Sequence, residues 1–327
     1  MDYNILLINF PLAVLSILFL WKGSEWVINS ASNIAHSLGI SDLVIGLTVV
    51  AIGTSAPEFA VTISAVMTGK ADISVSNIVG SNIFNLGFIL GGTASIYAIK
   101  TTPKLVYRDG FFLIGVTLLL SFILFDFQLF SFSEAITPGK MTRIEGVILF
   151  AILIGYMSFL FFKREDLGEE VTHEKPSWKD WLILVIGLAA VVGGGHLLVS
   201  SASQIARVFG VSDWVIGVTI VAAGTSAPEF ATSMMALIKG RHGMAIGNLI
   251  GSDLFNLLGV LGLAGILRAP LVISPEARGS MFMLVFMVVL VVVFMRTSWK
   301  ISRWQGFTLV VLNLIRWTLD FMGKKII

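Results

Sequence analysis

The sequence predicts an all-α integral membrane protein with ten transmembrane helices, built as two inverted five-helix repeats. Three observations predict this fold. The 327 residues are 56% hydrophobic and only 13% charged, whereas a soluble protein is typically about one quarter charged. Long apolar segments recur along the whole chain, and one block of sequence occurs twice with few changes.

Composition also excludes several classes of protein. The net charge of +2 is too small to suggest a nucleic-acid partner, and the absence of cysteine excludes disulfides and thiolate metal sites. The apolar segment 5–20 follows Asp2 without a basic residue, and Trp21 and Trp26 come after it in place of a clean cleavage site. We therefore predict a retained first helix and not a signal peptide.

Ten segments are long and apolar enough to cross a bilayer, which takes about 20 residues. They are residues 5–29, 42–68, 72–98, 110–126, 143–162, 180–203, 213–238, 244–267, 279–296 and 305–321. The first five form an N-terminal repeat over residues 1–162, and the last five form a C-terminal repeat over residues 180–327. The charged segment 163–179 is too polar to span a membrane, and we interpret it as a cytoplasmic linker between the repeats.

The loops between these segments differ in basic charge. Alternate loops, together with the linker, hold twelve Lys and Arg residues, against seven on the opposite side. Since cytoplasmic loops carry the excess of basic residues, the pattern predicts a multi-pass protein of the cell membrane with both termini outside. Lys324 and Lys325 oppose this orientation, because they would lie on the outer side.

The duplicated block shows how the halves are related. Residues 39–60 and 210–231 are identical at 17 of 22 positions, and both contain the heptapeptide G-T-S-A-P-E-F. The same offset of 171 aligns residues 77–85 with 248–256. Five predicted helices, an odd number, separate the matching points, so the two copies cross the membrane in opposite senses. Inverted repeats are typical of transporters whose substrate sites lie at mid-membrane on interrupted helices.

Each copy of the heptapeptide places one glutamate inside the membrane, Glu58 and Glu229. Burying such a charge costs about 2.5–3.5 kcal/mol on insertion scales, and residues 43–67 and 214–238 contain no Lys or Arg. Two symmetric carboxylates without a local basic partner suggest bound cations. Inverted symmetry predicts that the two glutamates meet at mid-membrane.

Other oxygen ligands surround each glutamate in the sequence. Proline before each glutamate removes a helical hydrogen bond, which should free carbonyl groups of the preceding turn. Hydroxyls lie within a turn, and serine and asparagine four residues apart share a helix face. This set of hard oxygen ligands suits Ca²⁺ or Na⁺. The predicted ligands are Ala51, Thr54, Ser55, Glu58, Ser81, Asn85, Ala222, Thr225, Ser226, Glu229, Ser252 and Asn256.

At these residues the chain resembles the cation/calcium antiporter superfamily, specifically its Na⁺/Ca²⁺ exchangers. The motifs G-T-S-A-P-E and G-S-[ND]-x-F-N, each present twice, carry the resemblance over nearly the whole chain. It implies a secondary active antiporter, not an enzyme, that exchanges Na⁺ for Ca²⁺ by alternating access. The ions would bind at mid-membrane between the repeats. No cofactor is implied, the partners are the two ions and the lipid bilayer, and one copy of the chain suffices for the site.

The resemblance also implies a role for each ligand. The two glutamates would bind Ca²⁺ together with the carbonyls of Thr54 and Thr225. The same glutamates would serve Na⁺ sites with Ala51, Ser55, Ser81, Ala222, Ser226 and Ser252. Asn85 and Asn256 would line the central position.

Three positions bear on ion choice. The motif G-S-[ND]-x-F-N ends in Asn85 in the first repeat and in Asn256 in the second. K⁺-dependent exchangers resemble a form with Asp at the second of these two positions. H⁺-coupled members usually carry an acidic residue in the second block of each half, and that pattern is absent because residues 77–85 contain no acid. Asp253 stands where the first repeat has Asn82, and is either a third charge near the ion path or a hydrogen-bonded packing residue.

Several alternative functions stay open. Within the superfamily they are Ca²⁺/H⁺ exchange and K⁺-dependent Na⁺/Ca²⁺ exchange. Outside it, paired intramembrane carboxylates could serve an intramembrane protease, for which two aspartates would be expected. A passive channel is the remaining reading.

Overall fold

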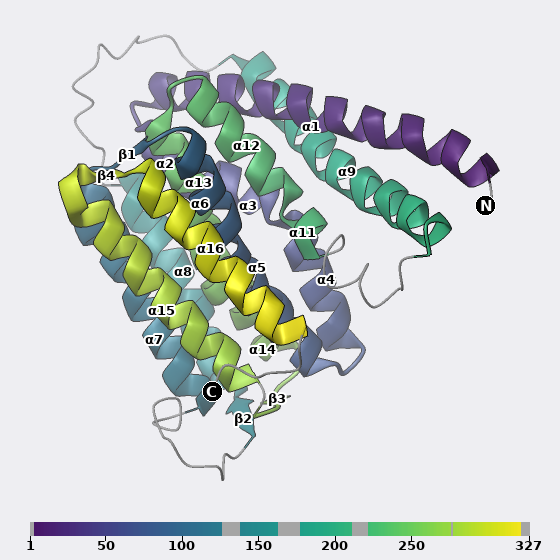
Figure 1. The fold of residues 1–327 in the computed structure, drawn as a ribbon. Coiled ribbons are helices and arrows are strands. Elements are labelled where there is room, and N and C mark those ends of the chain that lie inside the picture. The colour runs from purple at the N-terminus through teal and green to yellow at the C-terminus, as the bar shows by residue number, and fades with distance from the viewer. Residues whose placement is uncertain (1–2, 126–137, 163–176, 211–221, 276, 322–327) are drawn as a thin grey trace. The chain divides into compact units, whose positions relative to one another are not determined.

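The structure, a computed structural model, describes residues 3–125, 138–162, 177–210, 222–275 and 277–321 (Figure 1). Contacts within the chain divide it into two compact units. The first unit comprises residues 1–57 and 163–248, and the second comprises residues 58–162 and 249–327. Each unit therefore contains residues from both predicted repeats.

Two long helices, α1 (Tyr3–Leu38) and α9 (Trp178–Val208), form the largest part of the first unit and lie side by side (Figure 1). Glycine permits their close approach, because a Cβ on Gly187 would lie 3.0 Å from the carbonyl oxygen of Gly23. Val27 covers Gly187, and Val191 covers Gly23. A capping box between Ser177 and Asp180 begins α9.

The rest of the first unit consists of short helical segments. Ser41 begins the first of them, because its hydroxyl accepts a hydrogen bond from the Val44 amide at 3.3 Å. This confirms the N-cap that a Ser-Asp pair predicts. The segments are α2 (Asp42–Ile45), η1 (Gly46–Val50), α3 (Ala51–Thr54), α11 (Ala222–Thr225), α12 (Ala227–Ile238) and the first part of α13 (His242–Leu254).

The second unit contains most of the remaining helices. Within it α14 packs against α8, α16 against α6, and α15 against both α5 and α7. Its helical elements are α4 (Ala56–Met67, from Glu58 on), α5 (Ala71–Phe84), η2 (Asn85–Leu90), α6 (Gly91–Ile96), η3 (Leu105–Gly110), α7 (Phe111–Phe125), α8 (Arg143–Phe162), the end of α13, η6 (Phe255–Val260), α14 (Leu261–Leu267), α15 (Ala277–Arg296), η7 (Thr297–Trp299) and α16 (Arg303–Phe321).

Two short antiparallel ribbons also belong to the second unit. β1 (Ile99–Lys100) pairs with β4 (Lys300–Ile301), and β2 (Gly139–Met141) pairs with β3 (Leu271–Ile273). Each ribbon joins a strand of the N-terminal half to a strand of the C-terminal half. The apolar periodicity of the sequence gave no signal for these ribbons.

Seven helical segments of the described chain are long and apolar enough to cross a membrane, or eight when the broken pair 42–54 and 56–67 counts as one span. The seven segments and the broken pair together match eight of the ten predicted spans. Residues 211–221, at the start of the predicted span 213–238, lie outside the described residues. The predicted span 305–321 corresponds to α16, whose 19 residues are more polar and do not pass the same test.

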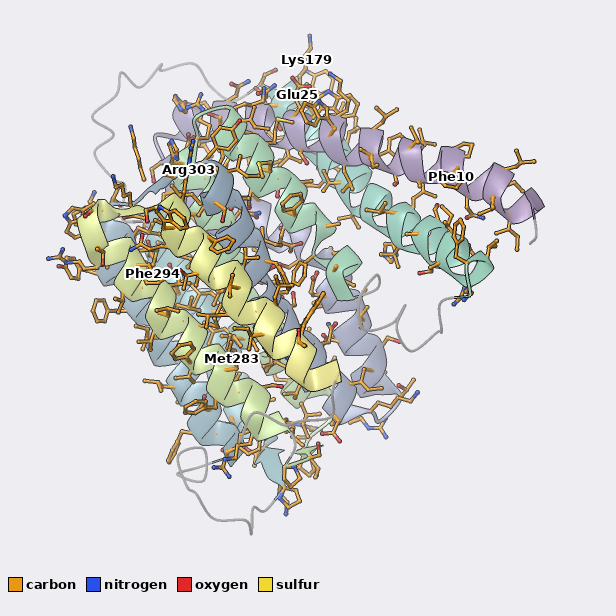
Figure 2. The ribbon with its side chains drawn as sticks, viewed as in Figure 1. Phe10, Glu25, Lys179, Met283, Phe294 and Arg303 are labelled. Atoms are coloured by element: carbon orange, nitrogen blue, oxygen red, sulfur yellow. The ribbon has the colours of Figure 1, made fainter. Side chains whose placement is uncertain are left out.

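Apolar side chains cover the outside of several of these helices, as expected for lipid contact. On α1, Leu7, Phe10 and Ile17 are exposed, and Figure 2 marks Phe10. The predicted linker falls mostly on residues 163–176, outside the described residues. The division into repeats at 1–162 and 180–327 and the orientation of the termini stay predictions.

The elements of the two repeats correspond. α3 and α11 begin at the same offset of 171, and so do α4 and α12, which have 12 residues each. In both repeats a π-helical segment follows the second block, η2 at Asn85 and η6 at Phe255. Such segments are rare and often mark functional sites.

Candidate cation-binding site

The helix that carries each glutamate is interrupted one turn before it. In the N-terminal half α3 ends at Thr54 and α4 begins at Ala56, with Ser55 at φ −78° and ψ 9°. In the C-terminal half Ser226, at φ −91° and ψ 9°, separates α11 from α12. Proline lies two residues after the break in both copies. This position is in the first turn of the next helix, where the proline ring is tolerated. Both predicted helix breaks are confirmed.

Glu229 is the carboxylate of the first unit. It lies in the first turn of α12 and is completely buried, where the positive end of the helix dipole stabilises negative charge. Ser55, on the break of the other repeat, donates a hydrogen bond to Glu229 Oε1 at 3.0 Å. Two residues predicted as ligands from opposite halves are therefore in direct contact.

Asn248 braces this arrangement from α13. Its amide nitrogen donates to the hydroxyls of Thr232 at 2.9 Å and Ser233 at 3.0 Å, and its oxygen accepts from Thr54 at 3.1 Å. Since Asn248 is fully buried, these bonds fix α12 against both α13 and α3. The sequence prediction missed this residue, although its position opens the second repeated block.

Glu58 is the carboxylate of the second unit. It is also completely buried in the first turn of its helix, and Ser81 of α5 donates to Glu58 Oε1 at 3.1 Å. Asn77, the counterpart of Asn248, donates to the Thr62 hydroxyl at 3.0 Å. The same asparagine brace therefore supports each glutamate within its own unit.

Four further polar side chains, Asn82, Asn85, Asp253 and Asn256, form a second buried group in the second unit, here called the amide cluster. Asn85 donates to Asp253 Oδ1 at 3.1 Å, and Asn256 donates to Asn82 Oδ1 at 3.0 Å. All four are fully buried. Asp253 therefore contacts a predicted ligand, and Asn82 joins the group although the sequence did not single it out as a ligand.

The other predicted ligands are distributed along the same elements. Ser226 and Ser252 are buried, Thr225 ends α11 half-buried, and Ala222 begins α11. One expectation is wrong: the Ala51 carbonyl is not free, because it accepts a hydrogen bond from the Ser55 amide at 3.0 Å. Helical bonding continues to the break, and the Thr54 hydroxyl also donates to this oxygen at 3.3 Å. That Glu58 and Glu229 meet at mid-membrane stays a prediction.

The chemistry of these residues favours hard cations. Each glutamate carboxylate contacts a serine hydroxyl, and carboxylate and hydroxyl oxygens are ligands that suit Ca²⁺ and Na⁺. Among the described residues, no group of three or more His, Cys, Asp and Glu side chains could hold a metal. The described part of the chain therefore offers no site of the kind that zinc or copper prefers.

Two acidic residues outside these groups form ion pairs within the first unit. Glu25 binds Lys22 at 2.9 Å and Lys239 at 3.6 Å, and Figure 2 marks it on α1. Asp42 binds Arg241 at 3.2 Å. These partly exposed pairs account for both carboxylates by contacts within the unit.

Comparison with known proteins decides the family. The family model described as sodium/calcium exchanger protein matches residues 8–162 and 179–316. The chain belongs to the sodium/calcium exchanger family. This confirms the resemblance seen in the motifs and makes the protein a cation/Ca²⁺ antiporter of the membrane.

Relatives of this family member match along most of their length. Sodium/calcium exchanger MaX1 from Methanosarcina acetivorans is 32% identical, over 93% of this chain and 96% of its own. Putative antiporter CaxA from Alkalimonas amylolytica is 40% identical, over 80% of this chain and 81% of its own. A solved structure of the sodium-calcium exchanger NCX_Mj, soaked without Na⁺ and Ca²⁺, superimposes with a TM-score of 0.81 at 31% identity, covering 94% of this chain and 97% of that one.

Proposed function

We propose that this antiporter exchanges Na⁺ for Ca²⁺ by alternating access, with the ions held by oxygen atoms of both repeats. Glu58 and Glu229 supply the negative charge. The hydroxyl, amide and main-chain oxygens predicted around them complete the coordination.

One observation carries the proposal: the buried Glu229 carboxylate accepts a hydrogen bond from Ser55 of the opposite repeat. A ligand pair drawn from both repeats is what an antiporter needs, because a change in how the repeats pack then changes the site and its access. The contact between Glu58 and Ser81 supplies the corresponding carboxylate and hydroxyl in the second unit.

Competition for the same oxygens would couple the two fluxes. The two negative charges of Glu58 and Glu229 can hold one divalent ion or several monovalent ions, and Ca²⁺ and Na⁺ take similar oxygen ligands. Because each ion then lowers the apparent affinity for the other, a Na⁺ gradient can drive Ca²⁺ in the opposite direction. The names of the relatives, a sodium/calcium exchanger and a structure studied with Na⁺ and Ca²⁺ as variables, support this choice of ions.

We further propose that the protein lies in the cell membrane with both termini outside. The excess of basic residues in alternate loops supports this orientation. Cysteine substitutions test it readily, since the native chain has no cysteine. In this orientation the loop after α1 is cytoplasmic. An impermeant maleimide applied to intact cells should therefore leave Leu38→Cys unlabelled, and labelling would contradict the proposed orientation.

The experiment that tests the proposed ions is ⁴⁵Ca²⁺ uptake into proteoliposomes with Na⁺, K⁺ and H⁺ gradients imposed one at a time. An outward Na⁺ gradient is expected to drive uptake without K⁺ or a pH difference. Uptake driven by a pH gradient alone would instead establish Ca²⁺/H⁺ exchange, and a requirement for K⁺ would establish the K⁺-dependent alternative. Saturable flux that needs a counter-ion would exclude a passive channel.

A further inference from the structure

Residue 253 has an unusual place in the amide cluster. It is an aspartate where the first repeat has Asn82, and two of its oxygen atoms accept hydrogen bonds from asparagine amides. The main-chain oxygen accepts from Asn82 Nδ2 at 3.1 Å, and the carboxylate Oδ1 accepts from Asn85 Nδ2 at 3.1 Å. Both acceptors are fixed on a helix and buried from solvent.

These two acceptors determine which end of each amide faces them. The oxygen and nitrogen of an asparagine side chain are similar in size, so hydrogen-bond partners decide the orientation. A carbonyl or carboxylate oxygen accepts and cannot donate. Asn82 and Asn85 must therefore turn their NH₂ groups toward residue 253.

The orientation of Asn82 then determines that of Asn256. With its nitrogen committed to the main chain of residue 253, Asn82 presents Oδ1 to Asn256, whose Nδ2 donates at 3.0 Å. The side chain of residue 253 thus orients Asn85, and its main chain orients Asn82 and, through Asn82, Asn256.

As a result, two amide oxygens of the cluster have no hydrogen-bond donor among the described residues. Oδ1 of Asn85 and Oδ1 of Asn256, like Oδ2 of Asp253, are buried and accept no hydrogen bond from the part of the chain that the structure describes. A buried acceptor without a donor is unfavourable, and amide oxygens are ordinary ligands of hard cations. A reversed amide would present NH₂, which repels a cation, at the same place.

We propose that Asp253 is a positioning residue, which fixes the amide cluster so that Asn85 and Asn256 present oxygen atoms to the transported cations. This inference rests on the proposed function and gives Asp253 and Asn82 roles within it. Asp253 acts here through its ability to accept, and its negative charge is not itself the ligand.

Repeat symmetry supports this assignment. Asn85 donates to residue 253, and the equivalent Asn256 donates to the equivalent residue 82. Asn82 therefore performs the accepting role with a neutral side chain. If asparagine suffices at position 82, asparagine should also suffice at position 253. Its amide could further donate to the main chain of residue 82, in the way that Asn82 donates to residue 253.

The test compares variants of the purified, reconstituted full-length protein. Asp253→Leu removes the side-chain acceptor of Asn85 and keeps the main-chain acceptor of Asn82, whereas Asp253→Asn keeps both. Ser74→Ala, on the same helix as Asn82 and equally buried, is the matched control. The readouts are the Ca²⁺ KM and maximal rate of exchange, and equilibrium ⁴⁵Ca²⁺ binding in detergent without Na⁺.

We expect Asp253→Leu to raise the Ca²⁺ KM and Kd about tenfold, or about 1.4 kcal/mol, and both Asp253→Asn and Ser74→Ala to stay within about threefold of the native values. A native Kd in Asp253→Leu would overturn the proposal. So would equal losses in Asp253→Asn and Asp253→Leu, because the charge of Asp253 would then be the ligand.

The exchanged pair Asn82→Asp with Asp253→Asn keeps the test decisive if the leucine variant does not fold. Inverted symmetry predicts that this double variant orients both amide oxygens as before and binds Ca²⁺ within about threefold of native; a loss of tenfold or more contradicts the proposal. If the native protein exchanges no Ca²⁺, the proposed function itself fails. If it does, an unexpected order of the variants removes only the positioning role.

Discussion

Ser55 donates a hydrogen bond of 3.0 Å to Oε1 of Glu229, although the two residues are 174 positions apart in the chain. Both side chains are fully buried; Ser55 lies at the helix break of one repeat, and Glu229 lies in the first turn after the equivalent break of the other. A hydrogen bond to a buried charge is among the stronger ones in proteins, worth about 1.5–3 kcal/mol. The contact therefore aligns a carboxylate of one repeat with the interrupted helix of the other.

Removal of this hydroxyl should weaken ion binding. Ser55→Ala takes away the donor to Glu229 and a predicted Na⁺ ligand, so we expect the KM for Na⁺ to rise about tenfold with a smaller change in maximal rate. The Na⁺ dependence of ⁴⁵Ca²⁺ uptake measures this. Ser201→Ala is the control, because that buried hydroxyl bonds only the Leu197 carbonyl of its own helix among the described contacts. Equal KM values in the two variants would contradict the role of Ser55.

The asparagine brace should matter for stability. Asn248→Leu leaves the hydroxyls of Thr54, Thr232 and Ser233 without the partner they share. We expect a loss of about 1–3 kcal/mol for buried groups left unsatisfied, seen as a lower thermal unfolding temperature of the purified protein. The exposed Asn33, which bonds Asp180 at 3.1 Å, offers the comparison: Asn33→Leu should leave the unfolding temperature nearly unchanged.

A buried polar triad in the second unit gives a prediction unrelated to transport. Asp109 is fully buried and accepts from Tyr156 at 2.8 Å and from Arg108 at 2.7 Å. Tyr156→Phe removes one donor and little volume, and should destabilise the protein by about 1–2 kcal/mol. Thermal unfolding checks this, and the Ca²⁺ KM should stay native. A changed KM with unaltered stability would place the triad in the ion path.

The ion pair between Asp42 and Arg241 should contribute little. Its atoms are 3.2 Å apart, but the Arg241 side chain is 38% exposed, and such pairs are worth about 0–1 kcal/mol. Asp42→Asn is expected to lower the unfolding temperature slightly at low salt and not at all in high salt. A large loss that persists in high salt would show that Asp42 has a structural role beyond this pair.

The sequence predicted the parts of the site that depend on local chemistry. Proline removes a helical hydrogen bond and favours the first turn of a helix, so the breaks at Ser55 and Ser226 could be expected from the heptapeptide. The repeat offset then indicated which residues correspond, and the structure reproduces that correspondence in α4 and α12.

What the sequence could not provide were partners fixed by tertiary packing. Asn77 and Asn248 stand in the repeated block, but their bonds to Thr62, Thr232 and Ser233 depend on how adjacent helices pack. The two β-ribbons pair residues at least 200 positions apart in one case and at least 130 in the other, and they are too short to show a pattern. For Asp253 the sequence left a third charge or a packing residue open, and only its contact with Asn85 indicates how it acts.

The central claim is that Glu58 and Glu229 hold the exchanged cations. The most direct measurement is Na⁺-driven ⁴⁵Ca²⁺ uptake into proteoliposomes containing Glu58→Gln or Glu229→Gln, with Glu25→Gln as the matched control on α1. Each intramembrane variant should lose Ca²⁺ uptake by about a hundredfold or more, since glutamine keeps the shape and removes the charge, a loss of about 2.7 kcal/mol or more in ion binding. The control should transport at the native rate. Normal uptake in either intramembrane variant would contradict the account.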